Sequence, residues 1–316
     1  MRACTLPAMR RSLTIALTTL ATLASQGSAA QSKDAPPAGP TFSADVAVGA
    51  EYDTNVSVEE VDATSGEEDY ALLLDLGAGV DIPLGQSADL SITYDLGNAK
   101  YDEFSQVDRQ THILGTDFAV DLGDVNTGLS AYYINARLDG DAFLELWRLS
   151  PSVSGFLSKR WFGRAAYVYL EKTIEDRPER DALAHAGELD VYFFRRGLRS
   201  YFNVGYQFRE EDAEAERFDF QSHNLKVRYI QRFEMFSLLN KLELAWRYED
   251  RDFTGVTPSI GEEREESRSR WKVDVEIPLT QRFTWQIYGG YGDYDSNLPV
   301  ADYTQTIVGT RMLYSW

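Results

Sequence analysis

Apolar and polar side chains alternate one by one along most of this chain. In residues 70–80 the even positions are apolar or aromatic, from Tyr70 through Leu74 to Val80, whereas most odd positions are acidic or glycine. A period of two places successive side chains on opposite faces of a β-strand. The chain is therefore expected to be all-β, with one apolar and one polar face on each strand.

Fourteen segments carry this pattern, and nearly all are 10–14 residues long. The connections between them alternate between short turns and longer, charged loops, except for one short loop near 139–143. The expected strands are 42–52, 69–82, 87–98, 109–121, 127–138, 144–157, 161–173, 182–194, 198–209, 219–231, 236–249, 266–278, 282–293 and 303–316.

Two architectures use many strands of this kind. A soluble β-sandwich has about seven to nine strands and buries their apolar faces in one core. A transmembrane barrel has strands of about 9–11 residues, turns its apolar faces to lipid, and joins its strands by short turns at one end and long loops at the other. The length of the segments and the alternation of the connections favour an antiparallel up-and-down barrel of about 14 strands (12–16) over residues 42–316.

The first thirty residues resemble a signal peptide. Arg2, Arg10 and Arg11 are followed by a short apolar run at 12–24 and by small residues before Ala30. This order is typical of a cleaved export signal, and the apolar run is shorter than a membrane helix requires. We expect a signal peptide at 1–30 and a disordered periplasmic lead at 31–41, and hence export to the outer membrane of a Gram-negative bacterium.

The chain ends on an alternating aromatic strand. Met312, Tyr314 and Trp316 share one face of it. Barrels of the bacterial outer membrane commonly end on such an aromatic residue, and the barrel-assembly machinery is expected to read these three residues as an insertion signal. Both termini would then lie in the periplasm, and the long loops would face the outside, next to lipid and lipopolysaccharide.

The chain is acidic, with 31 lysine and arginine residues against 50 aspartate and glutamate residues and a net charge of −19. This charge argues against a nucleic-acid partner. In a barrel the acidity belongs to loops and lumen. Inward positions of the first four strands are acidic with hardly a cation, and cations appear from the sixth strand onward. The lumen-lining residues expected are Asp75, Asp95 and Asp117 on an acidic wall, and Arg148, Arg209, Lys226, Arg228, Lys241 and Arg247 on a basic or mixed wall.

Opposed walls of this kind would create a transverse field that selects solutes by charge. The alternative is that the inward charges pair across strands and only fill the lumen. Fourteen strands lie between the small barrels that side chains fill and the sixteen-stranded porins that hold an aqueous channel. Loops 53–68 and 250–265 are long enough to constrict such a lumen.

A catalytic reading finds little support. The chain has three histidines, His112, His185 and His223. Neighbouring acidic or hydroxyl residues fall on the opposite strand face, so none forms a dyad. Surface or girdle histidines are the better interpretation. No ligand cluster or phosphate loop indicates a metal or a cofactor, and we expect no enzymatic activity.

Two segments resemble a known group of barrels. GAEYDTNVSV at 49–58 closes the first strand, and a D-S-N-x-P sequence at 295–299 precedes the final strand. This pattern is similar to the barrel domain of surface lipoprotein assembly modifiers and to a broad group of β-barrel porin families, some of them associated with exopolysaccharide export. The resemblance implies a fourteen-stranded barrel that works with an export partner and has no catalytic residue. Those modifiers also carry a periplasmic domain of helical repeats, for which residues 31–40 leave no room.

The leading interpretation is a channel or translocation pore for small solutes or for an exported polymer or polypeptide. Two alternatives stay open: a non-conducting export accessory that depends on a periplasmic partner, and a structural or adhesive barrel that acts through its acidic loops.

Overall fold

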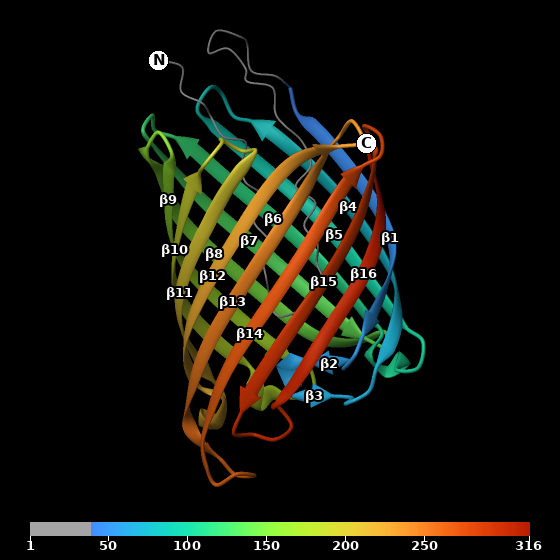
Figure 1. Cartoon of the computed structure of the whole chain (residues 1–316). Coiled ribbons are helices and arrows are strands. Elements are labelled where there is room, and N and C mark those ends of the chain that lie inside the picture. Colours follow the sequence, from blue (N-terminus) through green and yellow to red (C-terminus); the bar gives the residue numbers. More distant parts are fainter. Residues whose placement is uncertain (1–38) are drawn as a thin grey trace.

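A computed structural model describes residues 39–316, which form one closed barrel (Figure 1). The predicted signal peptide and nearly all of the predicted lead lie outside the described residues. The barrel strands are β1 Thr41–Asp53, β4 Asp69–Pro83, β5 Ala88–Tyr101, β6 Arg109–Asp121, β7 Val125–Leu138, β8 Asp141–Ser158, β9 Trp161–Ile174, β10 Ala182–Phe194, β11 Ser200–Ala213, β12 Phe220–Met235, β13 Leu238–Thr257, β14 Glu262–Pro278, β15 Phe283–Ser296 and β16 Tyr303–Ser315. The loops add short strands β2 Ser57–Val58 and β3 Ala63–Thr64, and 3-10 turns η1 Glu59–Val61, η2 Ser105–Val107, η3 Pro178–Arg180 and η4 Glu216–Phe218.

Fourteen antiparallel strands close on themselves. Each pairs with its neighbours in sequence, and β1 pairs with both β4 and β16. The last ladder runs from Asp45 opposite Ser315 to Asp53 opposite Ile307, and the Trp316 amide donates to the Ala44 carbonyl at 2.9 Å. Closure leaves no strand edge unpaired, which a sheet in lipid requires. The predicted fold class and strand number are confirmed.

The two ends of the barrel differ. We call the end with the short turns and the C-terminus the turn end, and the opposite end the loop end (Figure 1). Segment 250–265, expected to be able to constrict the lumen, instead prolongs β13 and β14 into a hairpin that projects beyond the loop end. The reason is visible in the register, which continues to Thr257 opposite Glu262 after an irregularity.

The barrel is apolar outside and polar inside. Outward side chains such as Leu72 and Trp271 are 70% and 57% exposed, whereas inward Asn203 and Arg311 are 0% and 3% exposed. Large exposed apolar residues of this kind belong against lipid. Within residues 39–316, no helix is long and apolar enough to cross a bilayer.

Inward glycines let large side chains lie flat against the wall. The phenol ring of Tyr288 lies over Gly309, where an added methyl group would overlap it. From this position Tyr288 donates a hydrogen bond to Glu51 at 2.7 Å, joining β15 to β1 across β16. The glycine is therefore a packing requirement of the closing seam.

We expect Gly309→Ala to lower the free energy of unfolding by about 1–3 kcal/mol, because the new methyl group displaces Tyr288 from Glu51. Urea unfolding of the refolded barrel in lipid measures this. Gly187→Ala is the matched control, since its added methyl group meets nothing within 4 Å. Equal stability of the two variants would contradict the packing argument.

Candidate functional site in the barrel lumen

The connection between β1 and β4 folds into the loop end of the lumen. We call it loop 54–68. Its entrance is held by Asn55, whose backbone amide donates to Asp53 Oδ1 at 2.9 Å and whose side-chain oxygen accepts from the Gly66 amide at 2.9 Å. Gln305 of β16 donates to both Asp53 oxygens, at 3.0 and 2.8 Å. The loop thus leaves the wall in a fixed direction.

One side of the loop tip packs on the far wall. Val58 and Val61 lie against a buried apolar cluster at the loop ends of β7, β8 and β9. The core of this cluster is Ala136, Phe143, Leu144 and Ile174. Because the loop starts between β1 and β4, this contact carries it across the mouth.

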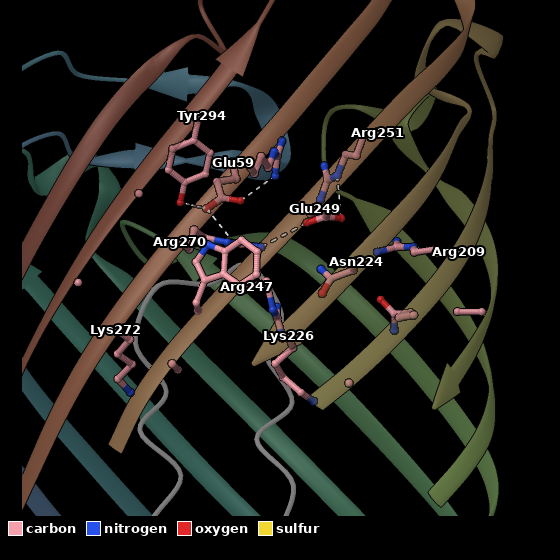
Figure 2. Close-up of a pocket in the computed structure, with 18 of the residues that line it drawn as sticks. Glu59, Arg209, Asn224, Lys226, Arg247, Glu249, Arg251, Arg270, Lys272 and Tyr294 are labelled. Carbon is pink, nitrogen blue, oxygen red and sulfur yellow. Dashed lines mark hydrogen bonds and ion pairs between the residues drawn. The ribbon is translucent and has the colours of Figure 1, made fainter. Parts of the chain in front are cut away.

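The other side of the tip carries Glu59, which meets β14 and β15. Arg268 Nη1 donates to Glu59 Oε2 at 2.9 Å, and the Tyr294 hydroxyl donates to Oε1 at 3.0 Å. Arg270 lies 3.8 Å from the same carboxylate (Figure 2). Glu59 therefore has cationic or hydroxyl donors at both oxygens.

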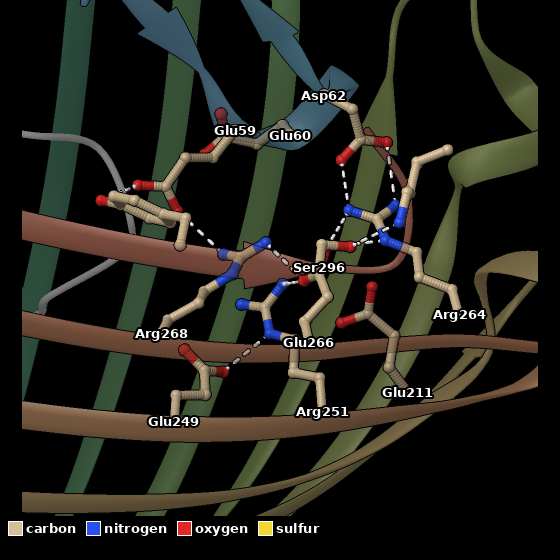
Figure 3. A network of polar contacts seen from close by, with 12 residues as sticks. Glu59, Glu60, Asp62, Glu211, Glu249, Arg251, Arg264, Glu266, Arg268 and Ser296 are labelled. Carbon is tan, nitrogen blue, oxygen red and sulfur yellow. Dashed lines mark hydrogen bonds and ion pairs between the residues drawn. The ribbon is translucent and has the colours of Figure 1, made fainter. Parts of the chain in front are cut away.

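Asp62 makes a second anchor beyond η1. It has a left-handed backbone, with a φ of 53°. Arg264 donates from two nitrogens to its two oxygens, at 2.7 and 3.1 Å (Figure 3). Arg180 of η3 donates to the same carboxylate at 2.5 Å. Burial opposes ionisation, but these two guanidinium groups outweigh it and lower the pKa of Asp62 to about 2.

Three of the arginines that hold the loop, Arg264, Arg268 and Arg270, are also paired to the wall. Glu266 accepts from Arg264 Nε at 2.6 Å and from Arg268 Nη2 at 2.9 Å. Glu249 accepts from Arg251 at 2.9 Å and from Arg270 at 3.3 Å. Charges so deeply placed are tolerated only when paired in this way.

Beneath the loop lies a cavity of about 540 Å³. Thirteen lysine and arginine residues line it against ten aspartate and glutamate residues, the reverse of the balance in the whole chain. The cationic residues are Arg148, Lys172, Arg180, Arg209, Lys226, Arg228, Lys241, Arg247, Arg251, Arg264, Arg268, Arg270 and Lys272.

The six residues predicted for a basic wall are among the cavity-lining residues, and several are paired. Arg148 lies 3.0 Å from Glu188, and Lys226 lies 3.1 Å from Asp190. The other pairs are Lys241 with Glu276 at 2.8 Å, Arg228 with Glu243 at 3.8 Å, and Arg209 with Glu211. The lumen thus combines pairing with a surplus of positive charge.

The predicted acidic wall is arranged differently. Asp75, Asp95 and Asp117 share the inward face by register but do not line the cavity. Asp75 pairs with Arg311 at 3.1 Å, and Asp117 accepts from Ser130 and Tyr132 at 2.5 and 2.8 Å. Register also places Arg109 on the inward face of β6, as a cation among these acidic residues.

Sequence reasoning missed the arginines of the mouth. Arg268 and Arg270 occupy even positions of the expected strand 266–278, so alternation alone could have placed them inside. The sequence predicted a loop at Arg264, because the expected strand began at residue 266. In the structure β14 begins at Glu262 and includes Arg264. Arg180 belongs to a 3-10 turn, and no local pattern predicts its contact with Asp62, which is 118 positions away.

All three histidines lie on the outer face. Each ring Nδ1 is hydrogen-bonded to a tyrosine hydroxyl on the preceding strand. The pairs are Tyr94–His112 at 2.7 Å, Tyr167–His185 at 2.5 Å and Tyr206–His223 at 2.7 Å. Among residues 39–316, no group of three or more histidine, cysteine or acidic residues is placed to hold a metal ion.

The residues predicted as an insertion signal also lie on the outer face. Met312 and Trp316 are exposed, and the Tyr314 ring packs between Phe283 and Trp316, with ring centres 4.8 and 4.6 Å away. Their reading by assembly machinery stays a prediction.

The comparisons with known proteins agree on the fold. No family model matches the sequence, and no curated protein matches it. OmpT, an outer membrane protein of Vibrio cholerae, aligns over 89% of this chain and 99% of its own, with 11% identity and a TM-score of 0.51. Its loop L8 deletion mutant aligns over 88% and 100%, with 11% identity and a TM-score of 0.52. An anion-selective porin from Comamonas acidovorans aligns over 88% and 99%, with 8% identity and a TM-score of 0.49.

The fold is that of an outer-membrane β-barrel. Together with its apolar outer face, this places the chain in the outer membrane of a Gram-negative bacterium. Identities this low show the fold alone, so the function of the barrel must be argued from its own lumen.

Glu60, at the tip of loop 54–68, is expected to make docking of the loop depend on pH. Burial, reinforced by the charge of Glu59, raises its pKa to about 7, while Arg109 and Lys172 act in the opposite direction. Glu60 therefore binds a proton more tightly in the docked loop than in a released loop, where its pKa would have the ordinary value of a glutamate. This contribution to docking is present at low pH and is lost as the pH rises through about 7.

We expect the barrel to conduct more at about pH 8 than at about pH 5, because deprotonated Glu60 weakens docking while Asp62 stays ionised throughout. Single-channel recording measures this. Glu60→Gln should flatten the dependence, and Glu67→Gln, at an exposed residue of the same loop, should preserve it. An unchanged pH profile in Glu60→Gln would assign the dependence to another group.

Proposed function

We propose that this outer-membrane barrel is a channel for small anionic solutes. The observation that carries the proposal is the reversal of charge in the lumen. A chain with a net charge of −19 lines its main cavity with more cations than anions. In a narrow pore with low-dielectric walls, such a surplus raises the local concentration of anions and repels cations.

The arrangement of the pairs supports conduction of solutes rather than a filled core. Lys226 and Lys272 border the cavity with side chains that are 32% and 44% exposed. Exposed ammonium groups can exchange partners with a passing anion, whereas deeply buried ion pairs are held in place. We therefore assign the basic wall to solute passage and propose no catalytic role for the lumen.

The acidic wall has a different role in this proposal. Asp75 pairs with Arg311 of β16 across the intervening β1, and Asp117 accepts hydrogen bonds from two residues of the adjacent strand β7. Together with Asp95 they would set the side of the lumen that anions avoid. Solutes would then follow the strands β8 to β14, along which the cavity cations lie.

A second candidate is an export accessory, favoured by the position of loop 54–68. The loop crosses the mouth and is fixed at Glu59 and Asp62. With the loop across its mouth, the barrel would pass a lipoprotein or a polysaccharide only after a periplasmic partner had opened the barrel. The segments that resemble assembly modifiers contain Asn55, which holds the loop, and Asn297, which accepts from the Glu265 amide at 3.0 Å.

We expect the refolded barrel in a planar bilayer to pass chloride in preference to potassium. Arg228→Gln should lower this preference by about twofold, because it removes one cation from the cavity wall. Arg199→Gln is the matched control, since Arg199 lies in a turn, pairs with Glu234 and has a side chain that is 53% exposed.

Reversal potentials in a salt gradient measure the preference. A cation-selective current would contradict the proposal. A barrel that stays closed at every voltage would favour the export accessory instead.

A further inference from the structure

The mouth of the barrel contains two sites that already hold carboxylates. Arg268 and Tyr294 grip Glu59, with Arg270 beside them, and Arg264 and Arg180 grip Asp62. Both carboxylates belong to loop 54–68, whereas every group that grips them belongs to the barrel wall or to η3. The loop is bound at its tip as a ligand would be.

We propose that Glu59 and Asp62 are a built-in ligand, and that the carboxylates of an entering solute take their places and release the loop. The solute class is a small molecule with two or more carboxylate groups. This inference rests on the proposed function and adds to it the identity of the solute and the means of opening.

The Asp62 site holds a carboxylate in a bidentate fork. Two nitrogens of Arg264 face two oxygens of Asp62, at 2.7 and 3.1 Å. This fork matches the two oxygens of a carboxylate. A phosphate could also accept from both nitrogens, but a single phosphate offers no second carboxylate for the Glu59 site. Asp62 is therefore a stand-in for the group that the site is shaped to bind.

Release of the loop would leave the wall intact. Arg264 and Arg268 both keep Glu266 as a partner, and Arg270 keeps Glu249. Each of these three arginines would thus hold one carboxylate permanently and exchange the other, whereas Arg180 would keep its contact with the Phe218 ring. Without these wall partners, departure of the loop would leave buried cations unpaired, at a cost that would prevent opening.

The tip of the loop has few backbone hydrogen bonds of its own. Its two short strands share two residue pairs, Ser57 with Thr64 and Val58 with Ala63. The apolar contact of its tip is confined to Val58 and Val61. Charge pairing is thus the main attachment of the tip, and a charged solute can compete for it.

Competition of this kind makes a quantitative prediction. A tethered carboxylate acts at an effective concentration of order millimolar, so it lowers the apparent affinity of any free carboxylate for the same arginines. Removing the tethered groups should therefore tighten solute binding, while removal of unrelated loop charges should not.

The test uses succinate and the full-length chain in planar bilayers. The variant Glu59→Gln/Asp62→Asn removes both tethered carboxylates at constant size. Its matched control, Glu67→Gln/Glu68→Gln, removes two charges from the exposed part of the same loop. The readout is the succinate concentration that produces half of the maximal change in chloride current, with inorganic phosphate as the comparison anion.

We expect the half-saturating concentration of succinate to fall by about tenfold in Glu59→Gln/Asp62→Asn and to stay unchanged in the control. Phosphate should require a higher concentration than succinate in both. Anion-selective current with the same half-saturating concentration of succinate in all three proteins would overturn the inference and leave the proposed function standing. A lower half-saturating concentration for phosphate than for succinate would overturn the carboxylate assignment.

A second measurement does not depend on charge variants. Cys4 is the only cysteine of the chain, so Cys4→Ser/Val61→Cys carries a single thiol at the packed side of the tip. Succinate should raise the rate at which a water-soluble thiol reagent modifies it by at least about fivefold, because release exposes the tip. An unchanged rate would overturn displacement of the loop. Absence of anion-selective current in every protein would overturn the proposed function itself.

Discussion

Closure of the hydrogen-bonded ladder between β1 and β16 is the constraint on which the rest of this molecule depends. In lipid, an unpaired backbone amide or carbonyl costs several kcal/mol, so a sheet survives there only without edges. Pairing from Asp45–Ser315 to Asp53–Ile307 removes the last edge. Once the sheet is closed, the alternation of side chains has only one outcome, with apolar residues against lipid and polar residues inside.

A polar interior carries a desolvation cost for its charged side chains, and ion pairs in the lumen offset this cost. Charges on the inner face of a barrel are partly removed from water and must find partners. Ion pairs between different strands supply such partners, as for Arg148 with Glu188 and Asp75 with Arg311. At the loop end the wall carries more arginines than its own carboxylates neutralise, and loop 54–68 supplies Glu59 and Asp62. The same surplus that would attract anionic solutes thus also holds the loop in place.

Much of the fold could be predicted because strand alternation is a local property. The expected segments 109–121 and 182–194 coincide with β6 and β10, and most others differ by a few residues. Errors concentrate at the loop end, where β13 and β14 extend far beyond the expected limits. There the strands leave the membrane and the apolar–polar contrast disappears, as in the acidic and basic residues at 262–266, so the pattern no longer marks a strand.

The sequence by itself determined the barrel class, the approximate strand limits, and the face on which residues such as Arg228 and Asp117 lie, since each follows from a period of two within one strand. Only the tertiary structure decided which charges meet. Asp62 and Arg264 are 202 positions apart in the sequence. Their contact depends on the direction of loop 54–68, which the hydrogen bonds of Asn55 fix, and on the width of a barrel of fourteen strands. Distances across a closed ring are set by all of its strands together, and no local pattern encodes them.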